Sequence, residues 1–143
     1  MFKAIVAFSG LLFFAVGSPV LAQVPRTASP TGAKVYFIAP KNGATVPAKF
    51  TVKFGLVGMG VAPVGVDLPD TGHHHLLVDA AKLPAMDAPI PVDDNHRHFG
   101  KGQTEATIEL KPGKHTLQLL LGDKNHIPHN PPVLSNKITI TVK

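Results

Sequence analysis

The feature that most restricts the fold is a series of short alternating apolar segments separated by proline and glycine turns. Phe50, Val52 and Phe54 alternate with polar or small residues, and residues 114–121 and 137–143 follow the same pattern. Side chains of a strand point alternately to opposite faces, so this period of two predicts half-buried strands. No long segment has a helical period, and the chain contains 14 prolines and 13 glycines. The sequence therefore predicts an all-β, antiparallel β-sandwich of about seven strands.

The beginning of the chain has the pattern of a secretory signal peptide. Lys3 precedes an apolar run over residues 4–16, and a Val-x-Ala site ends at Ala22. The run is shorter than the ~20 residues that span a bilayer. We expect residues 1–22 to be cleaved, the protein to be periplasmic or secreted, and no membrane span to remain. An uncleaved anchor is the alternative.

The rest of the chain is expected to form one domain. Residues 23–33 are polar and contain prolines, which predicts a flexible N-terminal lead before a sandwich domain over residues 34–143. Residues 80–103 form a long connection with three prolines, which indicates either a functional loop or an unrecognised element; a short helical turn at Ala80–Leu83 is one possibility. The expected core consists of Phe37, Phe50, Val52, Phe54, Leu77, Ile108, Leu117, Leu119, Ile138 and Ile140.

Composition excludes several function classes. The chain has no cysteine, which removes disulfides, thiolate catalysis and thiolate metal sites. Its net charge is +5, but the lysines are scattered without a basic run, so nucleic-acid binding is disfavoured. The serines lie outside any nucleophile-elbow motif, and there is no His-Glu-x-x-His helix, so catalysis has little support.

Histidine is the abundant chemical group, with eight residues in the chain. His73, His74 and His75 open an apolar run that predicts a strand, so His73 and His75 share one face and His74 points to the other. The remaining five are His96, His98, His115, His126 and His129. His115 is expected to be a corner or core residue.

Two motifs resemble a bacterial immunoglobulin-like domain. They are Ile-Ala-Pro-Lys-Asn-Gly-Ala-Thr-Val at residues 38–46 and Leu-Lys-Pro-Gly-Lys-His-Thr-Leu at residues 110–117, followed by a closing Ile-Thr-Ile-Thr-Val. This resemblance implies an immunoglobulin-like antiparallel sandwich, in which the Leu-x-Pro-Gly turn links the fifth strand to the sixth. It implies nothing about function.

Further motifs resemble a bacterial family catalogued only as a domain of unknown function, DUF4399. They are Gly-His-His-His-Leu at 72–76, His-Phe-Gly-Lys-Gly-Gln-Thr-Glu at 98–105, Pro-Gly-Lys-His-Thr-Leu-Gln-Leu at 112–119 and Gly-Asp-x-x-His-x-Pro-His at 122–129. The resemblance implies an exported small β domain and brings no activity. Residues 40–46 are also similar to periplasmic copper-binding sandwich proteins, which typically use a histidine at the mature N-terminus. Here that position is expected to be Gln23.

An immunoglobulin-like topology would bring histidines together. Its third and sixth strands are antiparallel neighbours, so the start of the third lies beside the exit of the sixth. His73 and His75 would then meet His126 and His129, with His96, His98 and Asp123 as possible additional ligands. Neutral imidazole binds copper(II) and zinc, and the scarcity of methionine disfavours copper(I).

Several functions remain open at this point. The preferred hypothesis is an exported module that holds copper or zinc through these histidines. The alternatives are a metal-free accessory or adhesion-type sandwich for an anionic or sugar ligand and, last, a small metallohydrolase. The histidines could equally form a hydrogen-bonded structural cluster, brace the proline-rich loop or lie exposed to solvent.

Overall fold

A computed structural model describes residues 24–143, so the expected signal peptide and Gln23 lie outside the described residues. The described part contains no helix, and therefore none that could cross a membrane. It contains the strands β1 Lys34–Ala39, β2 Thr45–Val46, β3 Lys49–Val57, β4 Gly60–Val61, β5 Thr71–Val78, β6 His96–Phe99, β7 Glu105–Glu109, β8 Gly113–Gly122 and β9 Ile138–Val142.

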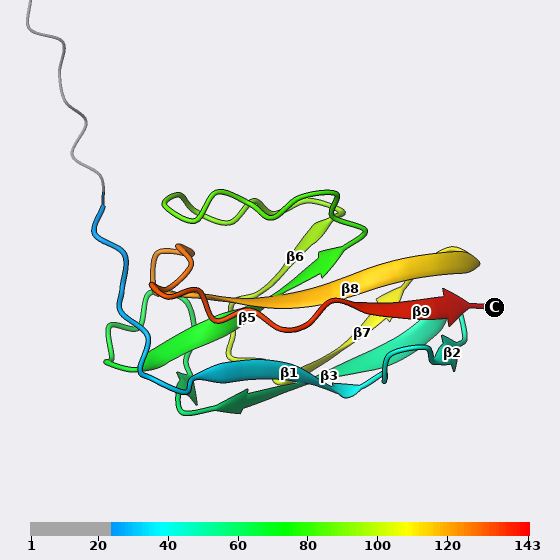
Figure 1. The fold of residues 1–143 in the computed structure, drawn as a ribbon, viewed down its shortest axis with the longest axis horizontal. Helices are drawn as coiled ribbons and strands as arrows, with labels where there is room; N and C mark the ends of the chain where they lie inside the picture. Colours follow the sequence, from blue (N-terminus) through cyan, green and yellow to red (C-terminus); the bar gives the residue numbers. More distant parts are fainter. Residues whose placement is uncertain (1–23) are drawn as a thin grey trace, which may run out of the picture.

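The strands form two packed sheets (Figure 1). The smaller sheet has the order β1-β3-β7, and the larger has the order β2-β9-β8-β5-β4, with β6 also pairing with β5. All pairings are antiparallel except β2 with β9 and β4 with β5. The expected all-β sandwich is therefore confirmed. The larger number of strands comes from short elements, of which β2 and β4 have two residues each.

The main core fills the space between the two sheets, and all ten residues expected in a core are buried. The alternation of Phe50, Val52 and Phe54 turns these side chains toward the larger sheet, where Leu117, Leu119 and Leu121 are part of the same cluster. Leu77 departs from this arrangement, because it packs with Ile90 and Leu120 in a second, smaller cluster. Since Leu76 and Val78 belong to the main core, alternation places Leu77 on the outer face of the larger sheet.

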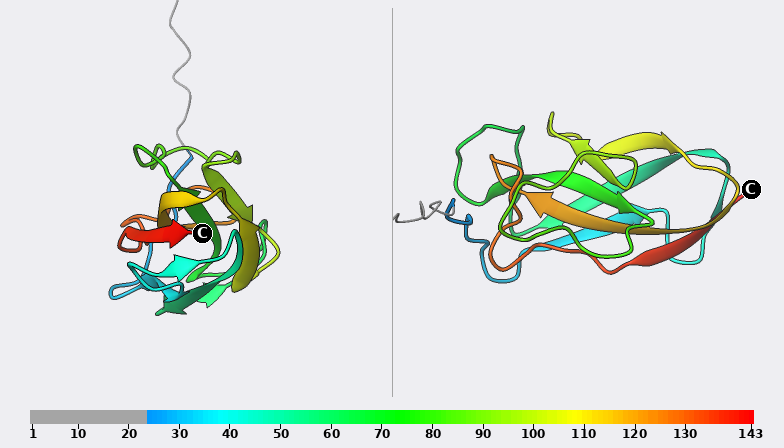
Figure 2. Two further views of the ribbon diagram at one scale, coloured as in Figure 1. Left: turned by 90° about the vertical axis from the view of Figure 1, so that its right-hand side faces the viewer. Right: turned by 90° about the horizontal axis from the view of Figure 1, so that it is seen from above.

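The long connection after β5 supplies that outer cover. The segment arches over β5 and β6 in Figures 1 and 2, and its residue Ile90 is buried against Leu77 and Leu120. The expected helical turn at Ala80–Leu83 is wrong: Ala81 and Lys82 form a bend, and the residues on either side are irregular. Pro84 disfavours a helical conformation at Leu83, and so short a helix lacks the hydrogen bonds that offset nucleation. The element hidden in this connection is instead β6.

Covering both faces of β5 buries almost all of its side chains, polar ones included. Seven of its eight residues are buried, in contrast to the alternating exposure of β1 and β3. The three consecutive histidines are therefore shielded from water whichever face they take. This double cover buries polar side chains on both faces of β5.

Candidate metal centre

Strand alternation separates the three consecutive histidines as expected. His74 points into the sandwich, where its ring lies 4.9 Å from that of Phe54. His73 and His75 share the outer face, and their ring centres lie 4.8 Å apart. The strand thus presents two imidazoles side by side outside the main core.

His98 joins this pair from β6. In the antiparallel pairing of β5 with β6, His98 lies directly opposite His75, so the two side chains project to the same face. The ring of His98 lies 5.1 Å from that of His75 and 5.0 Å from that of His73. The sequence offered a signal for this residue in the spacing of His96 and His98, but the position of β6 could not be read from it.

His126 reaches the same site from the loop after β8. The pairing of His73 with Gly122 confirms that the start of β5 lies beside the exit of β8. His126 has a left-handed backbone conformation, with φ of 64°. Its N–H donates to the carbonyl oxygen of Asp123 over 2.9 Å, and its own carbonyl accepts from Ile90 N–H over 2.8 Å. These bonds hold a conformation that a non-glycine residue rarely adopts.

The four imidazoles form a compact group. The ring centres of His98 and His126 lie 4.6 Å apart, and those of His73 and His126 lie 5.1 Å apart. One nitrogen from each of the four rings can be chosen so that all lie within 4.8 Å of one another. His73 and His75 form the buried side of this group, and His98 and His126 are partly exposed. Such a cluster could hold a metal ion.

The buried nitrogens of this group lack other partners. Both ring nitrogens of His73 and His75, and Nε2 of His98, have no hydrogen-bond partner in the described part of the chain. A buried polar atom without a partner carries a desolvation cost of roughly 1–3 kcal/mol. A hydrogen-bonded structural cluster, which the sequence left open, would have shown bonds between these rings. The described residues contain none for His73 and His75.

Burial also keeps these rings uncharged. Desolvation, followed by repulsion from His98 and His126, lowers the pKa of His73 to about 4. Desolvation, followed by repulsion from His73 and His98, lowers the pKa of His75 to about 2. The pKa of His98 is lowered by desolvation and by His126. Metal binding requires neutral imidazole, so these three rings are in the ligating form at neutral pH.

His129 lies on the other side of β5. The ring of His129 lies against Gly72: a Cβ at Gly72 would be only 2.9 Å from Cε1 of His129. Gly72 shares its face with His74, opposite His73 and His75. The Nε2 of His129 lies 3.1 Å from the carbonyl oxygen of Thr71, to which it donates. The structure therefore does not bring His129 into the group of four.

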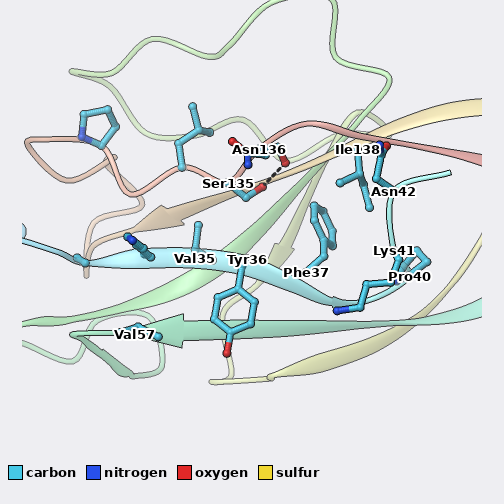
Figure 3. A pocket seen from close by; sticks show the side chains of 14 residues that line it. Val35, Tyr36, Phe37, Pro40, Lys41, Asn42, Val57, Ser135, Asn136 and Ile138 are labelled. Carbon is cyan, nitrogen blue, oxygen red and sulfur yellow. Dashed lines mark hydrogen bonds between the residues drawn. The ribbon is translucent and has the colours of Figure 1, made fainter. Parts of the chain in front are cut away.

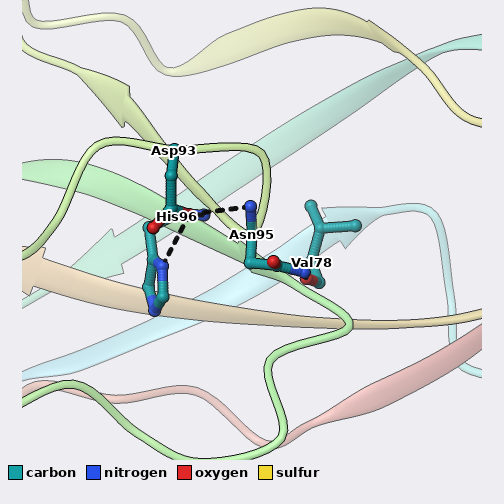
Figure 4. A network of polar contacts seen from close by, with 4 residues as sticks. All are labelled: Val78, Asp93, Asn95 and His96. Carbon is teal, nitrogen blue, oxygen red and sulfur yellow. Dashed lines mark hydrogen bonds and ion pairs between the residues drawn. The ribbon is translucent and has the colours of Figure 1, made fainter.

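His96 also lies outside the group, and its own polar contacts are drawn in Figure 4. Its Nδ1 lies 2.8 Å from Oδ1 of Asp93, and the same oxygen accepts the N–H groups of Asn95 and His96. The side-chain amide of Asn95 in turn donates to the carbonyl oxygen of Val78 over 2.7 Å. His96 thus helps to close the turn that leads into β6.

Asp123 lies beside the group rather than within it. Its Oδ1 accepts N–H groups from Asn125 and Ile127, and its Oδ2 accepts the hydroxyl of Thr27 over 2.6 Å. Burial alone would raise the pKa of Asp123, but these three hydrogen bonds hold it below its usual value. The carboxylate therefore organises the turn that carries His126.

The N-terminal lead contacts the same loop. Arg26 donates to the carbonyl oxygens of Pro128 and His129. Backbone hydrogen bonds join Asn130 N–H to Thr27 and Ser29 N–H to Asn130. These contacts could not be predicted, because Arg26 and Thr27 lie in a polar segment without periodicity. Through Thr27 and Asp123, the lead is connected to the turn of His126.

Comparison with known proteins assigns the family. No curated protein and no solved structure matches the chain. A family model described as a domain of unknown function, DUF4399, matches residues 52–143. This range includes all four histidines of the cluster, together with Asp123 and the glycines beside them. The chain therefore belongs to the DUF4399 family of domains of unknown function.

Proposed function

We propose that this protein is an exported binding module that holds a divalent transition metal, copper(II) or zinc, through His73, His75, His98 and His126. The observation that carries the proposal is the convergence of four imidazoles whose nitrogens lie within 4.8 Å, with the buried ones lacking any other partner. Imidazole suits both metals, and four neutral nitrogen donors complete a four-coordinate shell. Relative to the ligand set expected from sequence, His98 takes the place of His129.

The chemistry of the cluster disfavours an anionic ligand and a hydrolytic role. Positive charge would stabilise a bound anion, whereas burial keeps His73 and His75 neutral at physiological pH. A hydrolytic metal centre keeps a position open for water, whereas four histidines converge here. The carboxylate of Asp123, at the start of the loop that carries His126, is occupied by three hydrogen bonds. Holding a metal is therefore favoured over hydrolysis.

Export belongs to the same proposal. The basic start, the apolar run over residues 4–16 and the Val-x-Ala site support cleavage after Ala22. A histidine site without thiolates also suits an oxidising compartment. Intact-mass measurement of the periplasmic fraction of an expressing bacterium should give a chain that begins at Gln23. A periplasmic species that retains residues 1–22 would favour an anchor instead.

Calorimetric titration of tag-free protein with zinc and with copper(II) at pH 7.5 tests metal binding. We expect saturable binding of one ion per chain, and loss of at least tenfold in affinity for His73→Ala, His75→Ala and His98→Ala. Because nitrogen-donor sites generally bind copper(II) more tightly than zinc whichever metal they hold in the cell, elemental analysis of the tag-free protein as purified identifies the metal. Absence of saturable binding by the wild-type protein contradicts the proposal.

Two histidines serve as matched controls. His74 is adjacent to two of the ligands but faces Phe54 on the opposite side of β5, so His74→Leu should bind metal as the wild type does. His96 is bonded to Asp93 outside the cluster, and His96→Ala should also retain affinity. Equal loss of affinity in His74→Leu and His73→Ala would indicate a general disturbance of β5 rather than ligation.

A further inference from the structure

A groove unrelated to the histidines runs along one side of the sandwich (Figure 3). It has a volume of about 690 Å³ and lies between β1 and residues 132–138, which precede and begin β9. Val35, Phe37 and Ile138 line it with apolar surface, and no histidine contributes to it. The groove is therefore separate from the proposed metal site.

One wall of the groove is an unpaired strand edge. β1 ends the smaller sheet, and among the described residues its only strand partner is β3. The N–H of Phe54 in β3 donates to Thr104 over 2.8 Å, so the backbone groups of Phe54 point toward β7. Phe37 lies opposite Phe54, and its N–H and C=O therefore point away from β3. The same alternation turns the N–H and C=O of Val35 outward.

The charged side chains that line the groove are all basic. Lys34 and Lys41 line it, together with the uncharged polar residues Asn42, Ser135 and Asn136, and no acidic residue contributes to its lining. A second copy of the chain that paired through β1 would bring the two lysine-bearing edges together, which like-charge repulsion opposes. An acidic occupant would instead have complementary charge.

We propose that this groove docks an extended segment of a partner protein that alternates apolar and acidic side chains. The segment adds to β1 as a further strand of the smaller sheet, using the outward N–H and C=O groups of Val35 and Phe37. Its apolar side chains lie over Val35, Phe37 and Ile138, and its carboxylates lie near Lys34 and Lys41. Main-chain pairing supplies affinity, and the two lysines supply the preference for acidic sequences.

Fluorescence anisotropy with a labelled, capped octapeptide of alternating valine and glutamate tests the docking proposal. We expect saturable binding that weakens at least tenfold when glutamate is replaced by lysine. The protein variant Lys34→Glu/Lys41→Glu should also weaken binding at least tenfold. The matched control Lys82→Glu/Lys114→Glu makes the same change of charge away from the groove and should bind as the wild type does. Circular dichroism should show that both variants are folded.

Peptide N-methylation tests strand addition without altering the protein. Successive N–H groups of an added strand point alternately to its two edges, and only one edge faces β1. N-methylation of the amides that face β1 should abolish binding. N-methylation of the amides on the other edge should leave the affinity within about twofold of that of the unmodified peptide. Equal effects of the two sets, or equal binding of the glutamate and lysine peptides, would overturn the proposal. Sedimentation showing a dimer that the peptide disrupts would also overturn it, by assigning the groove to a second copy.

Discussion

Gly122 provides the space that the His75 ring occupies. A Cβ at this position would lie 2.7 Å from Cε1 and 3.1 Å from Nδ1 of His75. The backbone of Gly122 has no positive φ, so an alanine there would be opposed by the ring and not by its own conformation. A Cβ at Gly100 would likewise overlap the ring of His98, at its Cε1. Two of the four proposed ligands thus depend on a neighbouring glycine.

The first prediction is that Gly122→Ala displaces His75 and weakens metal binding. We expect the dissociation constant to rise at least tenfold in calorimetric titration, because the ring can no longer share one ion with His73 and His98. Gly60→Ala is the matched control, since its Cβ would meet Thr71 at an ordinary 3.4 Å. Unchanged affinity in Gly122→Ala would show that His75 is not a ligand in its present position.

His115 makes a separate contribution at the opposite end of β8. Its Nδ1 lies 2.6 Å from Oδ2 of Asp79, and its Nε2 lies 2.8 Å from the carbonyl oxygen of Lys111. Both partners only accept hydrogen bonds, so the doubly protonated ring satisfies both. The hydrogen bond with Asp79 is the main cause of the raised pKa of His115. This agrees with the corner role expected for His115.

The second prediction follows from that raised pKa. A group whose pKa is higher in the folded state contributes stability that is fully present below its unfolded value of ~6.5 and is lost as pH rises through the folded value. We expect the free energy of unfolding of metal-free protein to fall as pH rises from 6.5 to 9, and Asp79→Asn to reduce this slope. Urea titrations at several pH values measure it. An equal slope in both proteins would contradict the assigned role of the pair.

The lead and the loop after β8 act together at the scale of elements. Thr27 donates to Asp123, and Asp123 in turn accepts the N–H groups that shape the turn of His126. The chain of contacts ends in a histidine with left-handed φ. Such a conformation persists when its surroundings hold it, and it costs of order 1–3 kcal/mol. Removing the hydrogen bond from Thr27 to Asp123 should therefore reduce the preorganisation of the metal site.

The third prediction is that Thr27→Val weakens metal binding several-fold and speeds metal release, although Thr27 is no ligand. Stopped-flow transfer of zinc to a chelator measures the dissociation rate. Thr27→Ser keeps the hydroxyl donor and should restore the wild-type rate. Thr51→Val removes a hydroxyl from an exposed pair with Thr107 and serves as the control. A rate for Thr27→Val equal to that of Thr51→Val would separate the lead from the site.

The strand elements were predictable from sequence because alternation and turn residues are local signals. The adjacency of β5 and β8 placed His73, His75 and His126 at one end of the sheet, as the structure has them. His98 could not be placed, because β6 has only four residues and follows a proline-rich connection. His129 was expected in the same group, but the side of β5 that it contacts depends on the loop path after His126, for which the sequence has no periodic signal.

Among residues 24–143, six of the eight buried ring nitrogens without a hydrogen-bond partner lie on one strand, β5. His73, His74 and His75 together bury six ring nitrogens without a hydrogen-bond partner in the described chain. Desolvation lowers the pKa of His74 to about 4, so its ring is uncharged in the core at neutral pH. A domain is typically stable by only about 5–15 kcal/mol, so these groups are a substantial cost. For His73 and His75, a bound metal would offset part of it.

The last prediction is therefore that metal raises the thermal stability of the whole domain. An ion that binds only the native state stabilises by about 2.7 kcal/mol at a free concentration one hundred times its dissociation constant, which corresponds to a rise in Tm on the order of 10 °C. Differential scanning calorimetry over a series of buffered zinc and copper(II) concentrations should show Tm increasing with metal. His73→Ala/His75→Ala should lose this dependence, and His74→Leu should keep it. A metal-dependent shift that survives the double substitution would place the ion elsewhere on the protein.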